Sequence, residues 1–145
     1  MTLLSTFPDL PLTAPIAGGE LVCINSLRSY VLAKLSGDSP LLVIAPSTRI
    51  ADDLSDEIRS LIGNHVINFP AWETLPHERL SPSSDTVGRR MAVLRRLAHP
   101  QEAEPISVLV TSARAFIQPI VAGLGEVPAL NISTGDDFPL EKLVS

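Results

Sequence analysis

Residues 41–63 read LLVIAPSTRIADDLSDEIRSLIG, and this stretch decides the fold class. Its first five residues are all apolar, which is typical of a strand buried on both faces of a parallel sheet. Pro46 ends that strand, Ser47 can cap a following helix, and Gly63 can end the helix. Within the helix, apolar residues recur at helical spacing, at Ile50, Leu54, Ile58, Leu61 and Ile62. The stretch therefore predicts one strand followed by one amphipathic helix.

The alternation of strand and helix signals continues on both sides of this stretch. Upstream, the apolar run 21–24 predicts a strand, and residues 26–35 predict a helix that Gly37 ends. Downstream, the predicted elements are strands at 65–69, 106–110 and 129–132 and helices at 85–98 and 111–121. Asp85 or Thr86 is expected to cap the first of these helices. The sequence therefore predicts an α/β fold, a parallel sheet flanked by helices on both faces.

The chain has 145 residues, which suits one domain of ordinary size. Residues 1–19 contain three Pro and two Gly, so we expect an irregular lead-in there. We expect residues 20–135 to form the α/β domain and residues 136–145 to begin a further, truncated domain.

Composition narrows the classes of function. The net charge of −5 argues against binding nucleic acid by bulk attraction, because phosphate binding needs a positive surface. The single cysteine, Cys23, lies between Val22 and Ile24 and is expected to be a buried small hydrophobe rather than a thiol nucleophile. No CxxC pair suggests a metal, and no signal peptide or membrane span is evident. We therefore expect a soluble, cytoplasmic protein with no membrane partner.

Ligands of parallel sheets bind beyond the carboxyl ends of the strands, so the first strand-to-helix loop is where a phosphate-binding loop would lie. Such a loop needs glycines, which let backbone N–H groups approach the phosphates. There is no glycine between Gly19 and Gly37, and Leu27, Arg28 and Ser29 stand where Gly-Lys-Thr would end the motif. The loop is a degenerate phosphate loop, and we expect it to bind no nucleotide cofactor.

Residues 69–90 read FPAWETLPHERLSPSSDTVGRR and combine the side chains of an active site with three prolines. The possible acid–base residues are Glu73, His77, Glu78 and Asp85. A small hydrolase that uses His77 and Ser81 stays possible, although no Gly-x-Ser-x-Gly turn would expose the serine. We favour a stiff contact loop, because prolines fix φ along it. The residues expected to shape this loop are Trp72, Leu75, Pro76, Glu78 and Arg79.

The helix predicted at 85–98 carries the one concentrated basic patch of this acidic chain. Its apolar face is predicted at Val87, Met91, Leu94 and Ala98. Arg89 and Arg96 fall opposite that face, and Arg90 and Arg95 flank it. Arg89, Arg90 and Arg96 are therefore candidates for contact with an acidic protein surface or a nucleic-acid backbone. The alternative is an ordinary solvated helix face.

The run FPAWETLPHERLSPSSDTVGRRMAVLRRL (69–97) resembles the N-terminal UvrB-homology module of bacterial transcription-repair coupling factors (Mfd). The specific part is W-E-T-L-P-[YH]-E-x-x-S-P, followed by D-x-x-x-x-R. The stretches LLVIAPSTRIADDLSDEIRSLIG and VLVTSARAFIQPI are similar to strand–helix units of the same module. The resemblance extends over residues 20–145 and implies that the chain is a piece of a much longer protein.

The resemblance implies a degenerate RecA-like, P-loop-like domain similar to domain 1a of UvrB. It implies a non-catalytic module in transcription-coupled nucleotide excision repair, where the full-length factor recruits UvrA to stalled RNA polymerase. ATP and Mg²⁺ would then belong to the motor domains of the parent, and this piece would bind DNA weakly or not at all. It would contact other domains of the parent, and no UvrA-contacting residue is assigned to it. The alternative implied by the same resemblance is an ATP-binding fragment of an active UvrB-like, helicase-family ATPase.

Overall fold

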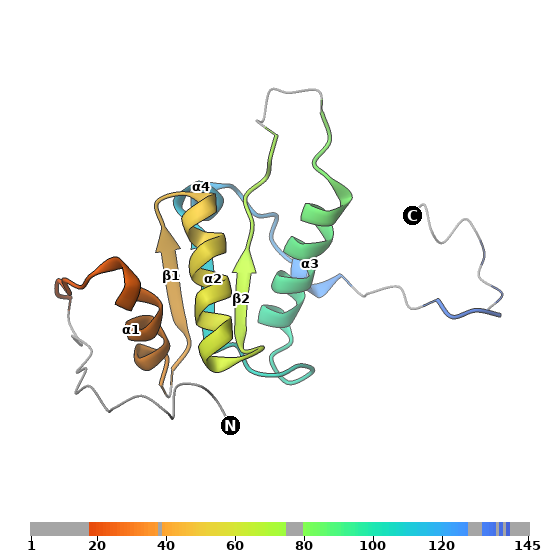
Figure 1. The fold of residues 1–145 in the computed structure, drawn as a ribbon. Coiled ribbons are helices and arrows are strands. Elements are labelled where there is room, and N and C mark those ends of the chain that lie inside the picture. Colours follow the sequence, from red (N-terminus) through yellow and green to blue (C-terminus); the bar gives the residue numbers. More distant parts are fainter. Residues whose placement is uncertain are drawn as a thin grey trace.

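The computed structural model describes residues 18–37, 39–74, 80–127, 132–135, 137 and 139. A three-stranded parallel sheet lies at its centre (Figure 1). The strands are β1 (Leu41–Ala45), β2 (Val66–Phe69) and β3 (Val108–Ser112), in the order β1-β3-β2. Leu41 and Val66 both align with Val108 of the central strand. The predicted α/β class with a parallel sheet is therefore confirmed.

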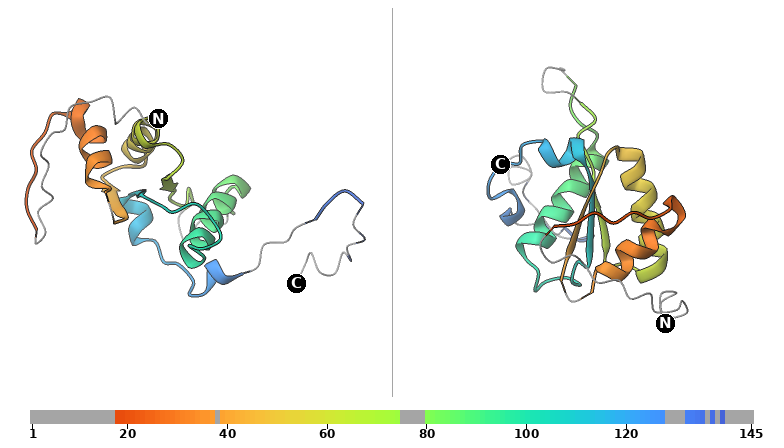
Figure 2. Two further views of the ribbon diagram at one scale, coloured as in Figure 1. Left: turned by 90° about the horizontal axis from the view of Figure 1, so that it is seen from below. Right: turned by 90° about the vertical axis from the view of Figure 1, so that its left-hand side faces the viewer.

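Helices cover both faces of the sheet. The helical elements are η2 (Asn25–Leu27), α1 (Arg28–Leu35), α2 (Thr48–Ile62), α3 (Ser84–Ala98), α4 (Ala113–Ile117) and η3 (Leu124–Glu126). In the side view, α1 and α2 lie on one face of the sheet, and α3 and α4 lie on the other (Figure 2). This arrangement places α2 and α3 on either side of the edge strand β2 (Figure 1).

The stretch 41–63 forms β1 and α2 as its sequence predicts. The Ser47 side chain accepts a hydrogen bond from the Ile50 backbone N–H, and Gly63 ends the helix with a φ of 83°. Such a φ is easily reached only by glycine. Ala51 and Ile58 are buried against β-strand valines in the main core, which comprises Ala33, Val43, Ala45, Ala51, Ile58, Val66, Val108 and Val110.

The expected strand at 21–24 is wrong. These residues are in no regular element, and Val22 is 86% exposed. Cys23 is half-buried rather than buried, because its neighbours lie in water. A short apolar run predicts a strand only where another strand is available to pair with it. The following helix α1 ends at Leu35 with Ser36 as its cap, one residue before the predicted Gly37.

Strand β1 is not buried on both faces, in contrast to the prediction. Leu42 is 47% exposed and Ile44 is 46% exposed, whereas Val43 and Ala45 are buried. The physical reason is that β1 is an edge strand, and the short helix α4 covers little of that face. Helix α4 itself ends at Ile117, before the predicted end at 121. The next residue, Gln118, is extended with ψ 133° because it precedes a proline.

The predicted boundaries near α3 and β3 also shift. Ser83 caps α3, rather than Asp85 or Thr86. The buried face of α3 comprises Thr86, Arg90 and Val93, so the predicted face at Val87, Met91, Leu94 and Ala98 is rotated from the true one. The strand predicted at 106–110 is displaced to β3 at Val108–Ser112. Of the strand expected at 129–132, only Ile132 lies within the described residues, and it is in no strand.

Candidate interaction site

Arg90 holds the chain segment that follows β2. Its guanidinium carbon lies 4.2 Å from the ring centroids of both Phe69 and Trp72, and its Nη1 donates to the Pro70 carbonyl at 2.7 Å. We call these four residues the Arg90 clamp. Arg90 is 2% exposed, so its prediction as a surface contact is wrong. Burial also lowers the pKa of its guanidinium, which stays charged because the aromatic faces and the carbonyl stabilise the cation.

The clamp is tied to the central strand and to α4. The Trp72 backbone N–H donates to Gln118 Oε1 at 2.8 Å, and Gln118 Nε2 donates back to the Trp72 carbonyl at 3.5 Å. Thr111 Oγ1 donates to the Phe69 carbonyl at 3.0 Å. The predicted contact residue Trp72 therefore acts as an internal anchor, which holds the exit of β2 in one conformation.

Glu73 joins the same segment to the start of α3. Ser83 Oγ donates to Glu73 Oε1 at 2.7 Å, and Thr86 Oγ1 donates to the same oxygen. These two hydrogen bonds, with Thr86 contributing more, lower the pKa of Glu73 to about 2. A carboxylate near a helix N-terminus is also favoured by the helix dipole. Glu73 is therefore ionised at neutral pH and is a poor proton donor, so it fits a structural role better than acid catalysis.

Five residues of the predicted contact loop lie outside the described residues: Leu75, Pro76, His77, Glu78 and Arg79. Ser81 and Asp85 are exposed on the approach to α3. The contact role of this loop and the hydrolase alternative at His77 both stay predictions.

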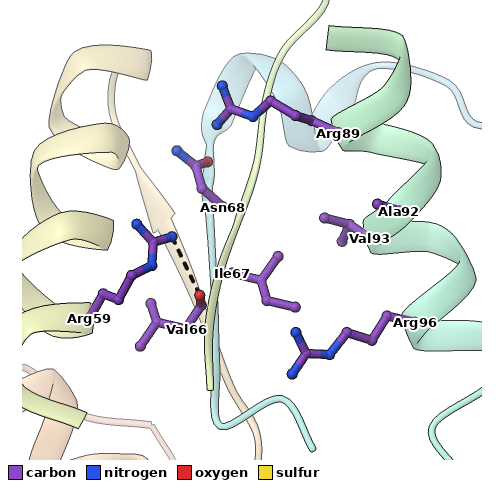
Figure 3. Close-up of a pocket in the computed structure, with 8 residues that line it drawn as sticks. All are labelled: Arg59, Val66, Ile67, Asn68, Arg89, Ala92, Val93 and Arg96. Carbon is purple, nitrogen blue, oxygen red and sulfur yellow. Dashed lines mark hydrogen bonds between the residues drawn. The ribbon is translucent and has the colours of Figure 1, made fainter. Parts of the chain in front are cut away.

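Three arginines converge beside the edge strand β2, as Figure 3 shows. Arg59 comes from α2, whereas Arg89 and Arg96 come from α3. They line a cleft of about 300 Å³ whose floor and walls are completed by Val66, Ile67, Asn68, Ala92 and Val93. We call this site the arginine cleft.

The three arginines differ in how far their charge is neutralised. Arg59 donates to Asp56 Oδ1 at 2.7 Å and also contacts Ser55 Oγ and the Val66 carbonyl. Arg96 donates through Nε and Nη2 to the Glu104 carbonyl, at 2.9 and 2.6 Å, and so meets no carboxylate among the described residues. Arg89 is exposed and has no hydrogen-bonding partner within the described ranges. The α3 side of the cleft therefore keeps two positive charges.

Two of the residues that line this cleft are contact candidates from the sequence, and their contact role stays a prediction. Arg89 and Arg96 were predicted as contact residues, and the structure brings them to one site (Figure 3). Arg59 was missed, because on sequence alone it is one of several polar residues on the outer side of α2. Only the strand order, which puts β2 at the edge between α2 and α3, could have joined it to the other two.

The degenerate phosphate loop forms a local helical start. Leu27 ends the short helix η2, Arg28 begins α1, and the Ser29 residue is buried. That this loop binds no nucleotide stays a prediction. In the part of the chain that the structure describes, no cluster of His, Cys, Asp and Glu could hold a metal ion. In the same ranges, no helix has both the length and the apolar character to cross a membrane.

Comparison with known proteins finds relatives that carry one name. The chain is 43% identical over 152 aligned residues to a Transcription-repair-coupling factor of Mycobacterium tuberculosis, and equally so to that of Mycobacterium bovis. The alignment covers 94% of this chain but 12% of either relative. The Transcription-repair-coupling factor of Escherichia coli is 30% identical over 73% of this chain and 9% of its own length. No family model matches the chain. The chain thus spans about an eighth of the length of the mycobacterial relatives.

Proposed function

This chain is a homologue of one segment of the transcription-repair-coupling factors, and we propose that it serves as a non-catalytic module of such a factor. The identity of 43% over 94% of the chain carries the proposal. The biological process is then the coupling of transcription to DNA repair. Contact with RNA polymerase and the repair machinery belongs to the whole factor, of which the matched segment is 12%.

We further propose that the module keeps a UvrB-like scaffold without its nucleotide chemistry. A parallel sheet covered by helices on both faces supports the scaffold. The absence of glycine between Gly19 and Gly37 supports the loss of nucleotide binding, because a backbone cradle for phosphates needs close approach. ATP hydrolysis with Mg²⁺ and recruitment of UvrA would then reside elsewhere in the factor. The acidic net charge agrees with weak or no direct binding of DNA, and the expected compartment is the cytoplasm.

A chimera tests the proposed module. The chimera is the mycobacterial factor in which the matching segment is replaced by this chain. It is expressed in cells that lack a coupling factor, and repair of the transcribed and non-transcribed strands is measured after ultraviolet damage. We expect the chimera to restore faster repair of the transcribed strand. The unaltered mycobacterial factor is the positive control. A chimera that accumulates normally and hydrolyses ATP, yet gives no strand preference, contradicts the proposal.

Calorimetric titration with ATP and Mg²⁺ separates this proposal from the alternative of an ATPase fragment. We expect no binding to the 145-residue chain. Tight, saturable binding of ATP would contradict the proposal of a non-catalytic module and favour the alternative of an ATPase fragment.

A further inference from the structure

The outer edge of β2 pairs with no strand in the described part of the chain. The His65 carbonyl accepts from the Ser107 and Val108 N–H groups, which sets the direction of alternate residues along this strand. Odd-numbered carbonyls therefore face β3, and even-numbered ones face outward. Arg59 donates to the outward carbonyl of Val66, and Arg90 donates to that of Pro70. The backbone N–H and carbonyl of Asn68 lie between them, on the open edge.

The charges above this edge have a definite spacing. Arg89 and Arg96 are seven residues apart on α3, or roughly 10 Å along the helix axis at about 1.5 Å per residue. Side chains on the same side of an extended strand recur at about 6.6 Å and about 13 Å for separations of two and four residues. The spacing of the arginines falls between these two values, and the long, flexible arginine side chains can make up the difference. Two carboxylates on the same side of a strand could therefore each reach one arginine.

Arg59 lines the arginine cleft from α2, and two exposed carboxylates of the same helix, Asp52 and Asp56, lie beside it. Asp56 accepts a hydrogen bond from Arg59. Asp52 also accepts a hydrogen bond from Asn68 Nδ2 at 2.5 Å. A nucleic acid carries a charge at every nucleotide, so a strand lying in the cleft would bring phosphates close to these carboxylates. An extended peptide can direct carboxylates toward α3 alone, because its side chains alternate between two sides.

We propose that the arginine cleft is a docking site for an extended acidic segment of a partner protein. The segment pairs with the backbone of Asn68 on the open edge of β2. Its carboxylates at alternate positions bind Arg89 and Arg96, through charge-assisted hydrogen bonds that guanidinium groups form well. Its other side chains are neutral or basic, because they face the carboxylates of α2.

The first experiment measures binding of a fluorescently labelled peptide of alternating Thr and Glu to the 145-residue chain, by anisotropy. We expect saturable binding that weakens with salt, and at least about a tenfold loss in Arg89→Glu. Arg28→Glu is the matched control, because Arg28 is an exposed arginine on α1, on the β1 side of the molecule (Figure 1). Binding that is absent, or reduced equally by both substitutions, would overturn the proposal.

The second experiment separates strand pairing from plain charge attraction. The same peptide with alternate backbone amides N-methylated is expected to bind at least about tenfold more weakly, since it cannot pair along a strand. In NMR spectra the Asn68 amide is expected to shift on binding of the unmodified peptide. Equal binding of the methylated peptide would overturn strand pairing. Tighter binding of an oligothymidine, lost in Arg89→Glu, would instead assign the cleft to nucleic acid.

Discussion

Arg90 lies in a run of basic residues on α3, yet it differs from its neighbours in burial and partners. Its planar guanidinium fills the space between the rings of Phe69 and Trp72 and donates to Pro70. A lysine would keep the charge but lose the stacking plane and the geometry of the donor. We expect Arg90→Lys to lower the free energy of unfolding by roughly 1–3 kcal/mol, measured by urea denaturation.

The matched control for this prediction is Arg89→Lys, one residue earlier on the same helix. Arg89 is exposed, so we expect its substitution to change stability by less than about 0.5 kcal/mol. Equal losses in the two variants would show that the Arg90 clamp contributes no more to stability than an exposed arginine does.

Glu73 gives stability a pH dependence of known sign. Its pKa in the folded state is lowered to about 2 from an ordinary value of 4.5. The ionised carboxylate is therefore favoured by folding, and its contribution is complete above pH 4.5 and lost as the pH falls toward 2. We expect Glu73→Gln to flatten the fall in the urea midpoint over this interval. The effect is modest, because solvent screens an exposed carboxylate.

Thr86→Val tests the cause of that shift. The Thr86 hydroxyl lowers the Glu73 pKa more than the Ser83 hydroxyl does, and Thr86 is buried. Valine keeps the shape of threonine but has no hydroxyl to donate. We expect the Glu73 pKa, followed by NMR of the side-chain carboxyl, to rise toward 4.5 in this variant. An unchanged pKa would assign the shift to Ser83 or to the backbone.

At the scale of elements, local signals predicted what depends on local chemistry. The strands β1 and β2 and the Ser47 and Gly63 ends of α2 are confirmed, because apolar runs and caps act over a few residues. The burial of β1 on both faces is wrong, because it depends on which elements cover the strand. The predicted face of α3 is wrong because the helix contacts two neighbours, β2 and η3, and buries Thr86 and Arg90. Residues 21–24 form no strand because no strand among the described residues pairs with them, and a local sequence pattern does not show which strands pair. The arginine cleft was not predicted for the same reason: Arg89 and Arg96 were candidates for contact on one helix, and Arg59 joins them only through the strand order.

The contact between α3 and η3 is close enough to demand a glycine. A Cβ built on Gly125 would lie 2.6 Å from the Leu94 carbonyl oxygen, which is backbone and cannot move alone. We expect Gly125→Ala to push η3 from the helix and to cost roughly 1–3 kcal/mol in thermal or urea unfolding.

Gly88 supplies the matched control for that substitution, because it lies in α3 and a Cβ added there would meet nothing within 4 Å. Gly88→Ala should be neutral or should raise stability by up to about 1 kcal/mol, through higher helix propensity. A loss in Gly88→Ala equal to that in Gly125→Ala would mean that the Leu94 contact is not the cause.

At the scale of the whole molecule, the two faces of the sheet are covered unequally. On the α2 side, the core residues of β1 are buried, whereas on the α3 and α4 side Leu42 and Ile44 are nearly half exposed. An apolar groove continues along this side, lined by Leu42, Leu97, Leu109, Phe116 and Ile120 among others. In the described part of the chain the outer edge of β1 pairs with no strand. A bare strand edge beside apolar surface is a common route to association.

We therefore expect the 145-residue chain to associate as its concentration rises, as measured by sedimentation velocity. Ile44→Lys should shift the chain toward the monomer, because it places a charge on the exposed face of the edge strand. The control is Leu80→Lys, which adds the same charge and removes a residue that is 71% exposed outside the groove. Leu80→Lys should leave association unchanged, since Leu80 lies on the approach to α3 rather than on the sheet. If all three proteins sediment alike at every concentration, the uncovered face of β1 does not drive association.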